Sequence, residues 1–122
     1  MKSILLMVIA GILAWSPAAA EEKKEIKVGF IYVSPVGDAG WSYAHNQARI
    51  DIDAMEGVET AFVESVPEGP DSERVMLNMA RKDFDLIFAT SFGYMDPMLK
   101  VAKRFPDIAF MHCSGFKTAP NM

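Results

Sequence analysis

Residues 34–47 read SPVGDAGWSYAHNQ and separate two hydrophobic patterns of different period. Before them, residues 27–33 (KVGFIYV) form a short apolar run that predicts a buried β-strand. After them, apolar residues recur at the spacing of one helix face: Trp41, Ala44, Ala48, Ile52 and Met55. The stretch is therefore interpreted as a strand-to-helix crossover. Ligands of open α/β sheets bind at the carboxyl ends of strands, so this crossover is the first candidate for a functional site.

Strands and helices are predicted to alternate along the rest of the chain. Strands are expected at about residues 26–33, 60–66, 84–89 and 107–113. The intervening helices are expected to begin near residues 40, 72 and 96. Asp71 or Ser72 is the expected cap of the second helix, and Asp96, followed by Pro97, that of the third. This β-α-β-α-β-α-β order predicts an α/β fold with a three-layer parallel sheet.

The first 20 residues have the pattern of a secretory signal peptide. Lys2 supplies a positive start, residues 4–15 a short apolar core, and residues 16–20 (SPAAA) small side chains before a cleavage site at Glu21. The apolar run is shorter than the about 18 residues expected for a membrane span. No cysteine follows it to carry a lipid anchor. We therefore expect residues 1–20 to be removed and the mature part, residues 21–122, to be exported without a lipid anchor.

The charge balance and the single cysteine narrow the function classes. The chain has 12 basic and 16 acidic side chains, and loss of Lys2 leaves 11 basic ones and a net charge of −5. Nucleic-acid binding calls for a clustered basic surface, so it is not expected. Cys113 is the only cysteine, which excludes an intramolecular disulfide. Export without disulfides fits a bacterial periplasm better than a disulfide-stapled extracellular module.

Polar and aromatic residues are predicted to gather at the carboxyl edge of the sheet. Asp38 can cap the first helix or accept hydrogen bonds from a ligand, and both interpretations stay open. Trp41 can pack in the core or stack on a flat ligand, and these two also stay open. Ser91 and Phe92 follow the third strand directly and would face the same cleft. For Asp96, helix capping and ligand contact are compatible.

Nothing in the sequence supports catalysis or a resident cofactor. Gly37 and Gly40 are expected to take positive φ angles, but without a third glycine they do not form a dinucleotide fingerprint. His112 and Cys113 are adjacent in a predicted strand and point to opposite faces, so they cannot act as a catalytic pair. A zinc site would need further histidines or cysteines near His112. We therefore expect no catalytic residues, no metal and no cofactor.

Two separated segments resemble the basic membrane protein (BMP) family, the PnrA-like purine-nucleoside receptors of ABC importers. The first combines the strand at 26–33 with residues 37–45 (GDAGWSYAH). The second is residues 91–96 (SFGYMD) followed by residues 101–107 (VAKRFPD). It is similar to the family's Gly-Phe-x-x-x-Asp segment and its Val-Ala-Lys-x-Tyr-Pro-Asp helix end. The resemblance spans nearly all of residues 26–116, with both segments in the family's order.

The resemblance implies a type I periplasmic-binding-protein fold, in which two α/β lobes close on a ligand. Residues 21–122 would be the N-terminal lobe of such a protein, incomplete and a fragment of it. The implied function is periplasmic capture of a purine base or nucleoside between the lobes, for an ABC permease in the inner membrane. By motif position, Trp41 corresponds to a phenylalanine that the family usually has in its first lobe. Asp96 corresponds to the family's first-lobe aspartate, and Asp38 to a polar position in its first loop. A monomer is implied for the full-length protein.

Departures from the family pattern affect the expected ligand and location. Ser91 replaces the usual glycine and Trp41 the usual phenylalanine, so a shift of preference toward a free base is expected. The absence of a lipobox cysteine implies a soluble periplasmic protein.

Other functions stay open from the sequence. One is a ligand-sensing periplasmic domain that feeds a signalling system. Another is a small exported flavodoxin-like enzyme, or a receiver domain of that fold. A receiver needs an acidic cluster after the first strand and an aspartate ending the third, where this chain has residues 33–35 (VSP) and 89–90 (AT). An inactive truncated product is also compatible with the pattern.

Overall fold

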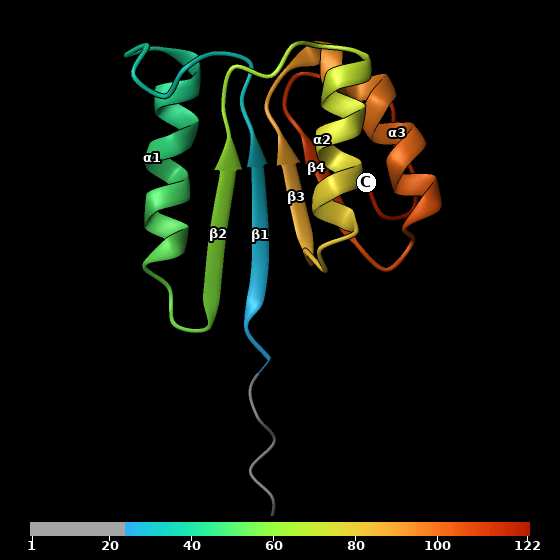
Figure 1. Ribbon diagram of the computed structural model, residues 1–122, viewed down its shortest axis with the longest axis horizontal. Coiled ribbons are helices and arrows are strands. Elements are labelled where there is room, and N and C mark those ends of the chain that lie inside the picture. The colour runs from blue at the N-terminus through green and yellow to red at the C-terminus, as the bar shows by residue number, and fades with distance from the viewer. Residues whose placement is uncertain (1–23) are drawn as a thin grey trace, which may run out of the picture.

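The computed structural model describes residues 24–122, so the predicted signal peptide at residues 1–20 lies outside the described residues (Figure 1). The strands are β1 (Ile26–Ile31), β2 (Val58–Val63), β3 (Leu86–Ala89) and β4 (Ala109–His112). The helices are α1 (Trp41–Asp53), α2 (Pro70–Ala80) and α3 (Met95–Arg104), and a 3₁₀ turn, η1 (Phe92–Tyr94), precedes α3. The elements alternate as predicted, although each strand is shorter than expected.

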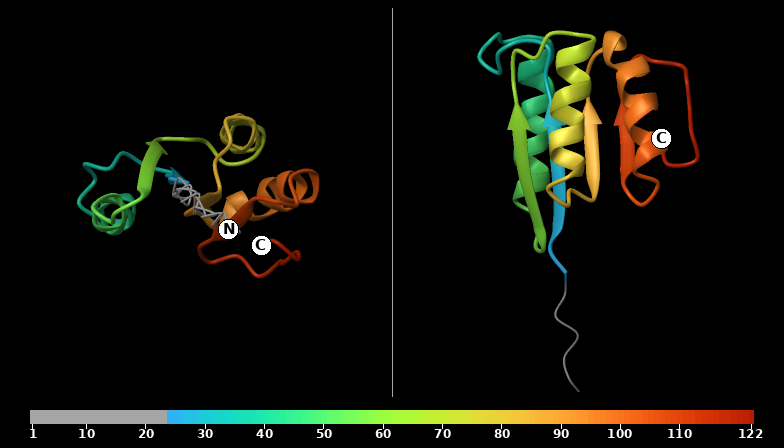
Figure 2. Two further views of the ribbon diagram at one scale, coloured as in Figure 1. Left: turned by 90° about the horizontal axis from the view of Figure 1, so that it is seen from below. Right: turned by 45° about the vertical axis from the view of Figure 1, so that its right-hand side comes forward.

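The four strands form one parallel sheet in the order β2-β1-β3-β4. Helix α1 covers one face of the sheet, and α2 and α3 cover the other (Figure 2). The predicted three-layer parallel α/β fold is therefore confirmed. Because all strands point the same way, their carboxyl ends and the loops that follow them meet at a single edge (Figure 1).

Helix α1 turns a polar side toward the sheet, which corrects the predicted apolar face. Ser42 and Asn46 are its buried residues, whereas Trp41 and Met55 are 47% and 59% exposed. Trp41 at the start of α1 and Met55 just beyond its end therefore point away from the core, whereas Ile52 packs against the cluster of Val28, Phe30 and Tyr32.

Hydrogen bonds along the inner side of α1 explain this orientation. Arg49 donates to the Asn46 side-chain oxygen and to the Thr60 hydroxyl of β2, both at 2.8 Å. The same guanidinium lies over the Phe62 ring, 4.9 Å from its centroid. A buried polar group is tolerated when it is hydrogen-bonded. Here the Arg49 guanidinium supplies hydrogen bonds to both the Asn46 side chain and the Thr60 hydroxyl. Hydrophobic periodicity does not record such pairing between elements.

The helix caps also differ from the prediction. Helix α2 is capped by Gly69, with φ 87°, and begins with Pro70 at its first position, so neither Asp71 nor Ser72 caps it. The Ser72 hydroxyl instead donates back to the Gly69 carbonyl at 2.8 Å.

Helix α3 begins at Met95 because η1 runs directly into it, and its cap is Tyr94. Asp96 is therefore an acidic residue of the first turn, where it suits the helix dipole, and it is not the cap. Pro97 stands at the third helical position, where no intrahelical donor is required.

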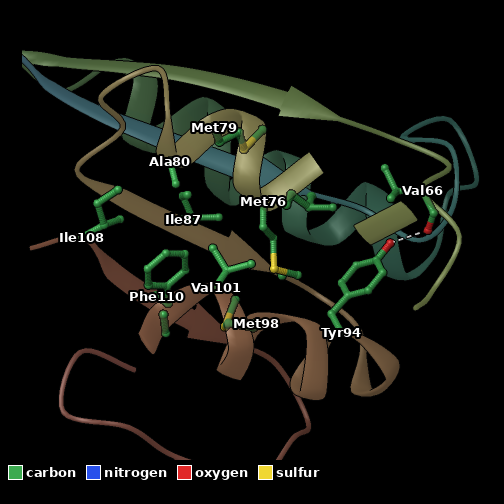
Figure 3. Packing of buried hydrophobic residues seen from close by; sticks show 13 residues of the cluster. Val66, Met76, Met79, Ala80, Ile87, Tyr94, Met98, Val101, Ile108 and Phe110 are labelled. Carbon is green, nitrogen blue, oxygen red and sulfur yellow. Dashed lines mark hydrogen bonds between the residues drawn. The ribbon is translucent and has the colours of Figure 1, made fainter. Parts of the chain in front are cut away.

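The main core lies between the sheet and the pair α2 and α3 (Figure 3). Met76 and Met98, one from each helix, are fully buried against Ile87 of β3. Tyr94 is also fully buried, and its hydroxyl donates to the Val66 carbonyl at 2.6 Å (Figure 3). This bond ties the loop after β3 to the loop after β2.

The last residues return to the sheet and close the end of α3. The carbonyl of Asn121 accepts from the Phe110 amide of β4 at 2.8 Å. Its side-chain amide lies within 3.1 Å of the carbonyls of Ala102, Phe105 and Ile108. Asn121 thus supplies donors to carbonyls at the end of α3 and at the start of β4. None of the helices within residues 24–122 has the length and apolar character that a bilayer crossing needs.

Gly29, in the middle of β1, allows α2 to approach the sheet closely. It pairs in register with Ala61 of β2 and Ile87 of β3. A Cβ atom at this position would lie 2.6 Å from the Met79 sulfur and 3.2 Å from the Phe84 ring. Both distances are shorter than ordinary van der Waals contact, so any side chain here forces the Met79 side chain and the Phe84 ring to move.

We expect Gly29→Ala to destabilise the fold by about 1–3 kcal/mol, because an inserted methyl overpacks this contact. The measurement is urea unfolding followed by far-UV circular dichroism. Gly37→Ala is the matched control, since a Cβ at Gly37 meets no atom within 4 Å and its cost should stay within about 0.5 kcal/mol. Equal midpoints for the two variants would contradict the close approach of α2.

Candidate functional site

The strand order reverses between β1 and β3. The chain leaves β1 toward β2 on one side, and later strands are added on the other side of β1. At such a switch point the loops after the two central strands diverge and leave a crevice at their carboxyl ends. The predicted ligand residues belong to these two loops and the helices they begin, so the candidate site is this edge.

Trp41 joins the two sides of the switch point. Its indole Nε1 donates to the carbonyl of Thr90, the residue that follows β3, at 2.5 Å. The indole packs edge-on against the His45 ring, with centroids 4.8 Å apart. With 47% of its surface exposed, Trp41 is not a core residue, so the core-packing interpretation is wrong and ligand stacking stays a prediction. The indole ring is therefore half exposed and is held at the end of β3 by its hydrogen bond to Thr90.

Asp38 organises the loop before α1. Its Oδ1 accepts from the amides of Gly40 at 2.8 Å and Tyr43 at 3.1 Å, and its Oδ2 accepts from the Ser34 hydroxyl at 2.6 Å. These bonds, that of Ser34 first, lower the pKa of the Asp38 carboxyl. The carboxylate thus satisfies amides at the start of α1, although the N-cap itself is Gly40, and about one of its four acceptor positions stays open.

The first loop carries a second correction. Ala39 takes the left-handed conformation, with φ 53°, whereas Gly37 and Gly40 do not. Ser34 and Ser42 hydroxyls lie 2.6 Å apart, and Ser42 also accepts from the Ser34 amide at 3.2 Å. The loop geometry is therefore set by side-chain hydrogen bonds more than by glycine.

We expect Asp38→Asn to reduce the acid sensitivity of the fold. The lowered pKa means that the carboxylate stabilises the folded state above its unfolded pKa, about 3.9, and that this stabilisation is lost as the pH falls through the folded pKa. The asparagine variant should thus lose less free energy of unfolding than the wild type between about pH 5 and pH 2. Urea unfolding at several pH values measures this.

Asp51→Asn, which removes the same charge from the exposed side of α1, is the control. An equal change of pH dependence in both variants would contradict a specific contribution of the Asp38 hydrogen bonds.

Glu68, from the loop after β2, reaches across to the loop after β3. Its Oε1 accepts from the Ser91 hydroxyl at 2.5 Å and from the Gly93 amide at 3.1 Å. Ser91 is only 9% exposed. Similarly, Glu64 at the end of β2 accepts from the Val36 amide of the first loop at 2.7 Å. Side-chain carboxylates therefore connect all three loops around the switch point.

Phe92 and Asp96 lie beside the segment that follows β4. Phe92 is 55% exposed, and its ring centroid lies 6.4 Å from that of Phe116. The Asp96 carboxylate is exposed and pairs with the Lys117 ammonium at 2.6 Å. An exposed pair of this kind contributes little stability, so its partners can exchange for a ligand at small cost.

The structure thus divides the five predicted site residues into three groups. Trp41 is bonded to the Thr90 carbonyl, next in sequence to Ser91, and Phe92 and Asp96 lie next to residues 116–117. All hydrogen bonds recorded for the Asp38 side chain stay within residues 34–43.

Sequence reasoning missed Glu68 as a residue of this edge. It stands between the predicted strand at residues 60–66 and the helix predicted to begin near residue 72. The available signal was an acidic residue shortly after a predicted strand, at the edge where all the loops gather. Its partners Ser91 and Gly93 are 23 and 25 residues away, so local pattern could not identify them.

A hollow of about 300 Å³ lies elsewhere, between β2 and α2. Ala61, Val75 and Met79 are among its lining residues, and none of the predicted site residues is. Its polar side chains are those of Asn78 and Lys82. No group of three or more potential metal ligands occurs within residues 24–122. We therefore keep the candidate site at the switch point.

The sheet is parallel, and its switch point carries a fixed aromatic ring and several hydrogen-bond acceptors. This combination is typical of a solute-binding α/β domain. Comparison with known proteins supports this class. Residues 25–122 match the family described as ABC transporter substrate-binding protein PnrA-like. The chain therefore belongs to this family of ABC transporter substrate-binding proteins, which is a solute-binding and extracytoplasmic family.

Two relatives and a solved structure illustrate the similarity. A purine-binding protein of Brucella abortus is 52% identical over 121 residues, which cover 98% of this chain and 34% of the relative. A protein of Haloferax volcanii, named as an ABC transporter glucose-binding protein, is 44% identical over 102 residues, 83% of this chain and 26% of the relative. The structure of an ABC transporter solute-binding protein from Conexibacter woesei superposes with a TM-score of 0.66 at 25% identity, over 70% of this chain and 28% of that one. The chain thus spans about a third or less of each.

Proposed function

We propose that this chain contributes the first lobe of a periplasmic receptor that captures a purine base or nucleoside for an ABC importer. The observation that carries the proposal is the Trp41 indole fixed to the Thr90 carbonyl across the switch point. A planar side chain held in this way is ready to stack on a planar ligand without first losing rotamer freedom. The name of the Brucella relative supports a purine as that ligand.

In this proposal, Trp41 stacks on the base while Asp96 and Asp38 accept hydrogen bonds from it. Asp96 exchanges Lys117 for the ligand, and the open acceptor position of Asp38 serves its loop and the ligand together. Ser91 and Phe92 complete this wall of the site. Closed sites bury most of a small ligand, so half-exposed residues such as Trp41 and Phe92 suit one wall of a cleft closed by a second lobe.

The remaining elements of the proposal concern location and partners. Residues 1–20 direct export, the mature protein is a soluble monomer of the periplasm, and lobe closure reports occupancy to an inner-membrane permease. The ligand leaves chemically unchanged. No nucleic acid and no cofactor take part.

Titration of Trp41 fluorescence tests the ligand class, because Trp41 is the only tryptophan after residue 20. Adenine, guanine, adenosine and guanosine should each quench the emission saturably, whereas glucose should not. Glucose is included because the Haloferax relative is named for it. Saturable binding of glucose alone would overturn the purine assignment and leave the solute-binding class intact.

Trp41→Ala should weaken purine binding by about 5- to 150-fold, the loss expected when one stacked base loses its aromatic partner. Isothermal titration calorimetry measures it, since the variant lacks the fluorophore. Tyr43→Ala is the control, because Tyr43 is a similarly exposed aromatic residue of α1, at 45%, that lies outside the proposed contacts. Equal affinity of the Trp41 variant and the wild type would remove Trp41 from the site.

A further inference from the structure

The carboxylate of Glu68 lies flat against the backbone of Gly93. A Cβ at position 93 would come within 2.1–2.4 Å of the Glu68 carboxylate atoms. The carboxylate can therefore occupy this position only because residue 93 has no side chain. The φ angle of Gly93 is not positive, and the backbone itself would accept alanine. The glycine is therefore required for space and not for conformation.

This arrangement fixes the direction of the hydrogen bond from Ser91. The amide of Gly93 can only donate, and it donates to Oε1 of Glu68. The same oxygen is 2.5 Å from the Ser91 hydroxyl, whose single proton is therefore directed to the carboxylate. Ser91 is left with lone pairs for any further partner. A serine hydroxyl that can normally donate or accept thus becomes an acceptor only.

Ser91 is adjacent to the platform on which the ligand is proposed to stack. The Nε1 of Trp41 donates to the carbonyl of Thr90, the residue directly before Ser91, so a ring stacked on the indole would lie near this peptide. We infer that Glu68 is a positioning residue that fixes the polarity of Ser91, so that the site favours a ligand N–H over a ligand carbonyl at this point. This inference rests on the proposed function.

Adenine and hypoxanthine form a suitable pair of probes. They have the same ring and similar size, but donor and acceptor are exchanged at both N1 and position 6. Whichever of these atoms faces Ser91, the two bases offer it opposite polarity. The ratio of their dissociation constants therefore reports the discrimination at Ser91, whereas a general weakening of the site changes both constants together.

The experiment measures this ratio by calorimetry on the protein expressed through the full length of its reading frame. For the wild type, we expect the two dissociation constants to differ by about three- to tenfold, which is the discrimination that one neutral hydrogen bond supplies. Glu68→Ala releases the Ser91 proton and should bring the ratio toward one. Ser91→Ala, which removes the hydroxyl, and Gly93→Ala, which displaces the carboxylate, should do the same.

Two further variants separate positioning from simple structural damage. Glu68→Gln retains an acceptor oxygen for Ser91 and Gly93 and should keep the wild-type ratio. Glu64→Gln is the matched control, because Glu64 is another carboxylate of this edge and accepts from the Val36 backbone. Its ratio should also equal that of the wild type.

The outcomes distinguish the inference from the function on which it rests. If the wild type binds both bases and Glu68→Ala keeps the wild-type ratio, the inference is wrong and the proposed function stands. If Glu68→Gln shifts the ratio as much as Glu68→Ala, charge and not hydroxyl polarity is responsible, and the inference is again wrong. If the wild type binds neither base nor the corresponding nucleosides, adenosine and inosine, the proposed function and this inference fail together.

Discussion

The structure depends on β1 being hydrogen-bonded on both of its edges and buried on both of its faces. It pairs in parallel with β2 and with β3, and helices cover it from both sides. Gly29 makes this possible on the α2 side, because the sulfur of Met79 occupies the space that a side chain would need. The central position of β1 also creates the switch point, since strands are added on either side of it.

The loops around the switch point are held mainly by side-chain acceptors. Asp38 binds amides of its own loop, Glu64 binds the amide of Val36, and Glu68 binds Ser91 and Gly93. Carboxylates in these positions orient the loops before a ligand arrives, which reduces the ordering cost of binding. The same groups give this edge a negative character, which suits neutral, donor-bearing solutes better than phosphorylated ones.

The fold could be predicted from the sequence because strand and helix periods alternate clearly and the strands are apolar. The orientation of α1 could not, since Ser42 and Asn46 face inward with side-chain hydrogen bonds to Ser34 and Arg49, which hydropathy does not record. The cap of α3 was assigned to Asp96 because Asp-Pro often starts a helix, but the 3₁₀ turn before it starts the helix earlier. In the candidate site, sequence position was enough to predict that Trp41 lies at the carboxyl edge of the sheet. It was not enough to reveal Glu68, whose role is defined only by contacts across more than twenty residues.

The contact between Glu68 and Gly93 also constrains how this sequence can change over generations. A methyl group at position 93 and a carboxylate at position 68 occupy the same volume, so the fitness effect of either substitution depends on the other. Alanine at position 93 fits without a clash once residue 68 has been shortened, whereas the reverse order passes through an intermediate with a displaced Glu68 carboxylate. Lineages that alter this corner of the site are thus expected to do so in one order, with position 68 changing first.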